Sequence, residues 1–240
     1  MKRDKLPYLL PIRSVVFLII FLAGSRITSK QLNDMSSWWT TVATIVNILT
    51  VIMLIYISRK NDMTYLDLIG YRKGDTPIKQ IVIISVMILS VGGGGMYLAG
   101  FLCYGILPYS PPMMIAPVPK VLALINFFLL PVTTALAEDG LYLGCGVNVI
   151  KNKTCAILVP AFFYTLQHSF IPVLIDARYI AYRFLSYLPL IIILCLYYHK
   201  KRNPLPIMVG HALIDLMTVI WVLASSFIPG FYEMMCSMAS

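Results

Sequence analysis

The stretch "VLALINFFLLPVTTALAEDGLYLGCG", residues 121–146, decides the fold class of this chain. Its apolar part leads directly into two adjacent acids, Glu138 and Asp139, which are the only charged residues in the stretch. A helix needs about 17 to 25 mostly apolar residues to cross the hydrocarbon core of a bilayer. The stretch therefore predicts a membrane-spanning helix that carries two carboxylates, and those carboxylates need an explanation.

The composition of the whole chain agrees with a membrane location. Of its 240 residues, 59% are hydrophobic and 12% are charged, whereas a soluble domain has about 25% charged residues. Helices are expected throughout, because lipid offers the backbone no hydrogen-bond partners. We predict an all-α polytopic membrane protein, one integral-membrane domain over residues 1–240, with membrane lipid as a partner.

Seven apolar segments are candidate spans, and the third and fourth leave an eighth span open. Four consecutive glycines in the third, residues 92–95, either allow a close helix contact or break the span. The fourth is long enough to be broken or tilted. The first resembles a signal peptide, but we interpret it as a retained span in which Arg13 reaches the lipid headgroups. The predicted spans are 7–24, 40–58, 78–103, 121–147, 155–174, 180–198 and 205–227.

The basic residues predict the orientation of these spans, because cytoplasmic loops are enriched in Lys and Arg. With the N-terminus in the cytoplasm, the outside segments carry only Arg26, Lys30, Lys120, Arg178 and Arg183. The inside segments carry Lys2, Arg3, Lys5, Arg13, Arg59, Lys60, Arg72, Lys73, Lys79, Lys151, Lys153, Lys200, Lys201 and Arg202. The polar stretch 59–77 is then a cytoplasmic loop, and the C-terminus lies outside. Because the basic residues are interpreted as topology signals and headgroup contacts, no nucleic-acid partner is expected.

After residues near the span ends and in loops are set aside, five ionisable residues remain inside the predicted spans: Glu138, Asp139, His168, His211 and Asp215. A charged side chain at mid-bilayer costs at least about 2.5 to 3.5 kcal/mol on insertion scales. Five of them facing lipid would cost on the order of 10 kcal/mol, which is comparable to the stability of a whole domain. We therefore expect these side chains to face the interior of the bundle, where intramembrane ionisable groups mark functional sites.

Their spacing places polar side chains on one face of each of three helices. His211 and Asp215 are four residues apart, as are Tyr164 and His168, and Glu138 and Tyr142. A bundle can bring these faces together. Taken singly, each face has a structural alternative. His168 could be a hydrogen-bonded histidine of the bundle, His211 and Asp215 could bond between helical turns, and the adjacent acids could lie at headgroup level.

A carboxylate in a pocket of low dielectric can act as a general base towards water, and histidines can polarise a carbonyl or transfer a proton. This combination predicts hydrolysis of an amide by an activated water molecule. The sequence contains neither GxSxG nor HExxH.

The three segments "EDGLYL" (138–143), "YTLQH" (164–168) and "HALID" (211–215) resemble the ordered motifs of the CAAX-protease and bacteriocin-processing family, the Abi or CPBP intramembrane proteases. The resemblance covers roughly residues 120–225. In that family the motifs are Glu-Glu-x-x-x-Arg, an aromatic residue four positions before a His, and His-x-x-x-Asn or Asp. The loop "YLDLIGYRKGD" (65–75) is also similar to family members.

The resemblance implies roles for the five residues. Glu138 would activate water with help from His168, while His211 and Asp215 would stabilise the oxyanion or steady the water. The first motif departs from the family at Asp139, which replaces a Glu, and at Leu143, which replaces the Arg. An Arg there would hold a carboxylate ionised and oriented, so either another cation substitutes or activity is lost.

Accounts of the family differ on metal use. We expect no cofactor; the alternative is a divalent metal such as zinc, held by Glu138, His168 and His211. The predicted function is an intramembrane endopeptidase that cleaves a membrane-associated or hydrophobic peptide, in what we expect to be a bacterial cell membrane. The alternative is an inactive family member acting as an immunity or regulatory membrane partner. A proton-coupled transporter is disfavoured because no inverted repeat is visible.

Overall fold

The computed structural model describes residues 2–74, 76–107, 109 and 111–238. In this part of the chain every named element is a helix, and no strand occurs. The elements are η1 (Arg3–Leu9), α1 (Ile12–Thr28), α2 (Leu32–Ser36), α3 (Trp39–Arg59), α4 (Tyr65–Leu68), α5 (Ile78–Tyr104), η2 (Pro112–Met114), α6 (Lys120–Thr134), η3 (Ala135–Val147), α7 (Lys153–His168), α8 (Ala177–Lys201), α9 (Leu205–Phe227) and α10 (Phe231–Met238).

Six helices of the described residues are long and apolar enough to cross a membrane, which confirms the predicted all-α polytopic class. They comprise η1 with α1, α3, α5, α6 with η3, α8 and α9. The predicted span 155–174 is shorter than expected, because its helix, α7, has 16 residues and ends at His168. The long fourth span is not interrupted: η3 continues α6 to Val147.

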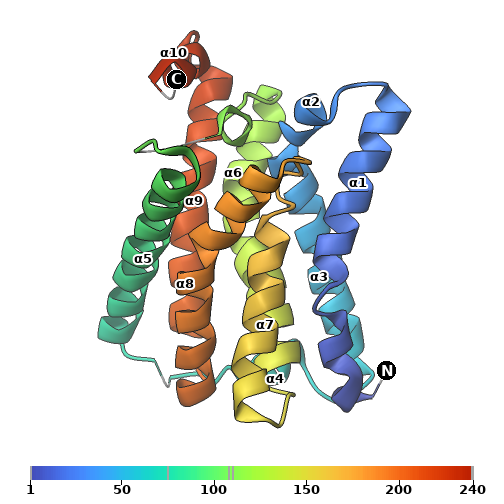
Figure 1. The fold of residues 1–240 in the computed structure, drawn as a ribbon. Coiled ribbons are helices and arrows are strands. Elements are labelled where there is room, and N and C mark those ends of the chain that lie inside the picture. Colours follow the sequence, from blue (N-terminus) through green and yellow to red (C-terminus); the bar gives the residue numbers. More distant parts are fainter. Residues whose placement is uncertain (1, 75, 108, 110, 239–240) are drawn as a thin grey trace.

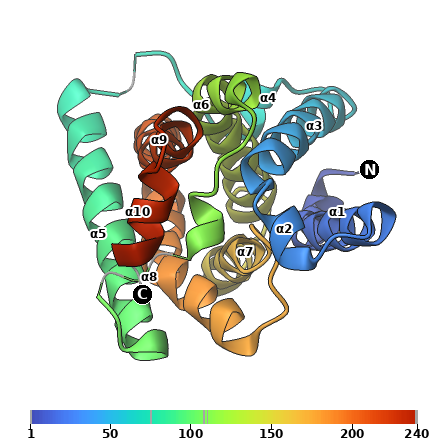
Figure 2. The ribbon, with the colours of Figure 1, turned by 90° about the horizontal axis from the view of Figure 1, so that it is seen from above.

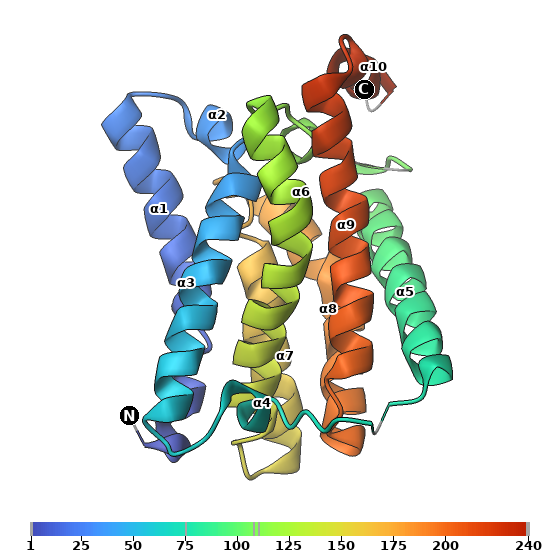
Figure 3. The same ribbon diagram turned by 180° about the vertical axis from the view of Figure 1, so that it is seen from behind.

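The helices run alternately up and down, so that the N-terminus and the C-terminus lie at opposite ends of the bundle (Figure 1). The N-terminus, α4, the start of α7 and the turn between α8 and α9 lie at one end (Figures 1 and 3). This is the end at which the predicted inside segments gather. Its assignment to the cytoplasm stays a prediction.

The segment 59–77 is not all loop, because residues Tyr65–Leu68 form α4. A capping box starts this helix: Thr64 accepts from the backbone N–H of Asp67, and the Asp67 carboxylate accepts from the backbone N–H of Thr64. The hydrogen bonds from Thr64 also lower the pKa of Asp67 below its usual value. Asp75, in the family-like loop, lies outside the described residues.

Seen along the bundle, α5 lies at one edge beside α8 and α9, while α1 lies at the opposite edge (Figure 2). The four glycines of α5 do not break the helix, which is continuous over Ile78–Tyr104, and two of them, Gly92 and Gly95, serve close packing. A Cβ atom on Gly95 would collide with the backbone carbonyl oxygen of Ser186 in α8, whereas a Cβ on Gly94 would meet nothing within 4 Å. Glycine is therefore required only on the side of the run that carries Gly95.

We expect Gly95→Ala to lower the free energy of unfolding by about 1–3 kcal/mol, because α5 and α8 must separate to admit the methyl group. Gly94→Ala is the matched control, and it should be neutral or stabilising because Ala has the higher helix propensity. Unfolding in mixed detergent micelles, followed by tryptophan fluorescence, measures both. Equal effects of the two substitutions would contradict the packing role of Gly95.

Candidate active site

The two acids of the opening stretch lie on η3, a π-helix of 13 residues, where Glu138 is 2% and Asp139 1% exposed. π-Helical segments are rare and often occur at functional sites. Close neighbours surround this one: Tyr65 donates a hydrogen bond to the carbonyl oxygen of Leu136 (2.6 Å), and a Cβ on Gly146 would press on Pro160 of α7. The acids are thus carried by a segment that other helices clamp in the centre of the bundle.

The structure brings together the five ionisable residues that the sequence singled out. Glu138 Oε2 lies 3.9 Å from His168 Nε2 and 3.8 Å from His211 Nε2. The other ring nitrogen of His211, Nδ1, lies 3.3 Å from Asp139 Oδ2, and its Nε2 lies 3.8 Å from Asp215 Oδ2. Residues from η3, α7 and α9 therefore meet at one place, although they are far apart in the sequence.

Asp139 and Tyr164 orient the ring of His211. The hydroxyl of Tyr164 donates to Asp139 Oδ1 (3.0 Å), and the same hydroxyl lies 3.1 Å from His211 Nδ1. With the proton assigned to Nδ1, His211 donates towards Asp139 and the Tyr164 oxygen, and its Nε2 faces Glu138 and Asp215. Asp139 and Tyr164 therefore face Nδ1 of His211, whereas Glu138 and Asp215 face its Nε2.

Two cavities of about 40 Å³ each adjoin this cluster, and both are lined by His168, Tyr187, Asp215 and Thr218. Each has room for water. Glu138 Oε2 and Asp215 Oδ2 have no hydrogen-bond partner in the described protein, and a buried carboxylate oxygen without a partner is costly. Because Glu138 Oε2 is less than 4 Å from both imidazole Nε2 atoms, one water molecule can hydrogen bond to all three groups.

Arg13 supplies the cation that the first motif lacks. It does not reach the lipid headgroups, as the sequence suggested, but is 1% exposed inside the bundle. Its Nη2 lies 2.9 Å from Glu138 Oε1 and donates to it. The same guanidinium donates to Asn47 (2.8 Å) and Thr50 (3.0 Å) of α3 and to Gln167 (2.7 Å) of α7. The pairing leaves Oε2 as the carboxylate oxygen that faces the histidines.

Arg183, predicted to lie in an outside segment, is also buried, at 2% exposed. It donates from Nε to the carbonyl oxygen of His168 (3.0 Å) and from Nη2 to that of Ile171 (2.7 Å). The ring of His168 stacks on Tyr187 at a centroid distance of 3.9 Å. Arg183 thus holds the end of α7, and Tyr187 holds the imidazole that projects from it.

Sequence reasoning missed the roles of Arg13, Arg183, Tyr187 and Gln167. For Arg13 two signals were present: it is a cation within an apolar segment, and Leu143 leaves the motif in need of one. The other three carry no comparable signal, because aromatic, amide and basic residues near helix ends are common.

The cluster does not match a tetrahedral zinc site. Ligands at about 2.0–2.2 Å from zinc lie about 3.3–3.5 Å from one another, whereas Glu138 Oε2 is 3.8–3.9 Å from the two Nε2 atoms. Among the described residues no group of three or more His, Cys, Asp or Glu has the spacing to hold a metal ion.

The comparison with protein families agrees with the motifs. Residues 120–217 match the family described as type II CAAX prenyl endopeptidase Rce1-like. This match confirms the resemblance to the CAAX-protease and bacteriocin-processing family, which is a family of proteases, and the six apolar helices indicate an integral membrane protein. No curated protein and no solved structure matches the chain significantly.

The ion pair between Arg13 and Glu138 predicts strong coupling between α1 and η3. Arg13→Leu should lower the free energy of unfolding by about 3–5 kcal/mol, because it leaves a buried carboxylate unpaired. The double variant Arg13→Leu/Glu138→Leu should lose less than the sum of the two single variants. A detergent-unfolding mutant cycle measures this coupling.

Arg26→Leu is the control for this cycle, since Arg26 is an exposed residue of the same helix, and it should change stability by less than about 0.5 kcal/mol. Additive effects of the Arg13 and Glu138 substitutions would show that the two side chains are not energetically paired.

Proposed function

We propose that this chain is an intramembrane endopeptidase in which Glu138 activates a water molecule to hydrolyse a peptide bond of a membrane-associated or hydrophobic peptide. The observation that carries the proposal is the meeting of Glu138 Oε2 with the Nε2 atoms of His168 and His211 at 3.8–3.9 Å. The match of residues 120–217 to a protease family supports the same reaction class.

In the proposed reaction, Arg13 holds Oε1 of Glu138 and favours its ionised form, which leaves Oε2 to accept a proton from water. His168 Nε2 orients that water. The resulting hydroxide forms a C–O bond with the carbonyl carbon of the substrate, and negative charge develops on the carbonyl oxygen.

His211, in its protonated form, donates from Nε2 to this oxyanion. Asp139 supports the imidazole at Nδ1, on the opposite side of the ring, and Asp215 lies near Nε2. When the intermediate collapses, the C–N bond breaks and the proton held by Glu138 passes to the leaving nitrogen. One water molecule is consumed, and a carboxylic acid and an amine are formed.

The substrate class follows from the surroundings of the site. The two cavities of about 40 Å³ each admit water but not a peptide, so the helices around them must separate for a substrate to enter. The outer faces of these helices are apolar, with Leu129, Val132 and Leu213 exposed to the membrane. An apolar peptide reaches the site from this environment with little desolvation cost.

The second candidate function is an inactive family member that acts as an immunity or regulatory membrane partner. The departures at Asp139 and Leu143 from the family's Glu and Arg motivate it. The position of Arg13 weighs against it, because Arg13 provides the charge that the Leu143 position lacks.

Glu138→Gln should lower the cleavage rate by about 100-fold or more, since the amide cannot accept the proton from water. Its side-chain oxygen still accepts from Arg13, so the protein should remain folded and monodisperse in detergent. Cleavage of a fluorogenic apolar peptide by protein reconstituted in vesicles measures the rate. Glu233→Gln, at an exposed acid of α10, is the control. Cleavage by Glu138→Gln at the wild-type rate would eliminate the general-base role. If cells that carry Glu138→Gln at normal expression lose the phenotype of the wild-type protein, the inactive-partner alternative is contradicted.

Removal of metal distinguishes a mechanism in which Glu138 activates water from a mechanism that depends on zinc. We expect dialysis against a strong zinc chelator to change the cleavage rate by less than about twofold, because the carboxylate and imidazole atoms are spaced for water and not for zinc. A rate that falls with chelation and returns on adding zinc would favour a metal held by Glu138, His168 and His211.

A further inference from the structure

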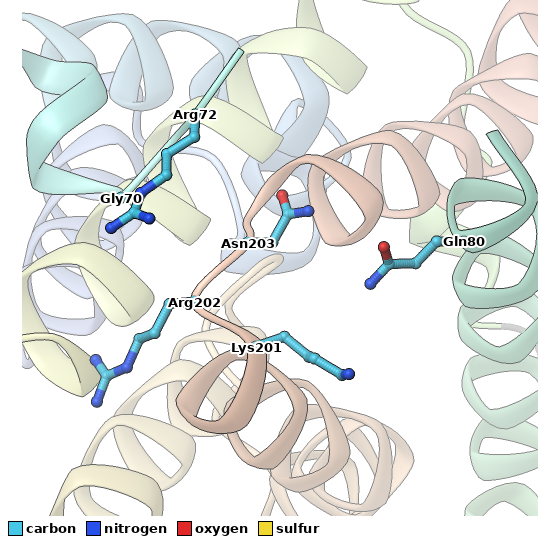
Figure 4. A pocket seen from close by; sticks show the side chains of 6 residues that line it. All are labelled: Gly70, Arg72, Gln80, Lys201, Arg202 and Asn203. Carbon is cyan, nitrogen blue, oxygen red and sulfur yellow. The ribbon is translucent and has the colours of Figure 1, made fainter. Parts of the chain in front are cut away.

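A second polar pocket lies away from the catalytic cluster, at the end of the bundle that holds the N-terminus and α4. It has a volume of about 370 Å³, and three separate segments form it. Gly70 and Arg72 come from the loop after α4, Gln80 from the first turn of α5, and Lys201, Arg202 and Asn203 from the end of α8 and the turn that follows (Figure 4). In the close-up, the side chains of Arg72 and Arg202 lie to one side of the turn and those of Lys201 and Gln80 to the other.

The lining of this pocket is strongly positive. It carries two guanidinium groups and one ammonium group, and none of its described lining residues is acidic. None of the ion pairs among the described residues involves Arg72, Lys201 or Arg202. Arg202 donates to the carbonyl oxygen of Val147 (3.2 Å) and to Asn148 Oδ1 (2.6 Å), both of which are neutral acceptors. The positive charge of the pocket is therefore not neutralised by these contacts.

Hydrogen bonds hold the walls of the pocket in place. Asn203 donates to Thr76 Oγ1 (2.8 Å), which ties the turn after α8 to the segment before α5. Gln80 donates to the hydroxyl of Tyr197 (2.5 Å), which ties α5 to α8. Tyr198 donates to the carbonyl oxygen of Ile69 (2.7 Å), next to Gly70. These bonds fix the segments that form the pocket, and Arg72 and Lys201 extend from them at exposed positions.

Arg202, like Ser29 and Asp62, has a backbone conformation that is uncommon for a residue other than glycine. This residue ends α8 with φ 53°, in the left-handed region. Glycine is the residue most often found at such a helix end, because a side chain there costs roughly 1–2 kcal/mol. The guanidinium of Arg202 is held at the edge of the pocket by its bonds to Val147 and Asn148.

We propose that this pocket binds a phosphate group, carried either by the headgroup of an anionic phospholipid or by a free phosphate. Arg and Lys are the side chains that bind phosphate through charge-assisted hydrogen bonds, and the amides of Gln80 and Asn203 add neutral polar contacts at the rim. The pocket lies at the ends of α5 and α8, where a span meets the headgroup layer, and basic pockets between membrane helices at that level bind anionic headgroups. The inference does not depend on the proposed peptidase activity.

The test uses the purified full-length chain and two probes. The first arm titrates phosphatidylglycerol into nanodiscs of phosphatidylcholine, and the second titrates inorganic phosphate against sodium chloride of equal ionic strength. The midpoint of thermal unfolding reports binding in both, because a ligand that binds the folded state stabilises it. A saturable shift with the lipid alone identifies the headgroup as the source, whereas a shift with inorganic phosphate identifies the free anion; either supports the site.

A pair of charge-matched variants distinguishes the pocket from a general basic surface. Arg72→Gln/Lys201→Gln removes two lining cations, and Lys73→Gln/Lys200→Gln removes the same charge from the adjacent exposed residues. For the probe that shifts the wild-type midpoint, we expect the pocket variant to lower the binding affinity about tenfold or more. The control variant should lower that affinity less than about threefold. Equal weakening in the two variants, or no saturable shift with either probe in the wild-type protein, would overturn the proposal.

Discussion

The ion pair between Arg13 and Glu138 is the interaction on which the rest of the site depends. Both side chains are almost fully buried, and neither charge can be left alone in the interior of a membrane protein without a cost of several kcal/mol. Their 2.9 Å contact, together with the bonds of Arg13 to α3 and α7, therefore fixes the first helix against the centre of the bundle. The carboxylate that results has one oxygen engaged and one oxygen free.

The π-helical segment that carries Glu138 presents the two adjacent acids to different partners. In the π-helical segment, Glu138 reaches Arg13 with one oxygen and the two histidines with the other, while the neighbouring Asp139 reaches Tyr164 and His211. Adjacent residues can then act in one cluster through different partners. The close approach of Tyr65 and Pro160 to the glycines of this segment leaves it little freedom to move.

Leu143 departs from the family motif, and the structure places the cation that pairs with the acids on a different helix. The motif that the chain resembles carries an Arg on the same helix as its acids, whereas here Arg13 of the first helix pairs with Glu138. The N-terminal segment is therefore part of the site, although residues 120–217 alone match the family. A motif read along one helix cannot detect this, because a charge acts through distance in space and not through position in the chain.

The sequence by itself determined the helical membrane class, most of the span positions and the identity of the five clustered ionisable residues. It could do so because insertion into lipid penalises exposed backbone groups and charges so heavily that their positions are legible in the residue pattern. The tertiary structure decided that α7 is short, that Arg13 and Arg183 are buried, and that one imidazole is held by Asp139 and the other by Tyr187. Those outcomes depend on which helix faces which. Hydrophobic periodicity gives little information on this choice, because apolar residues occupy every face of a membrane helix.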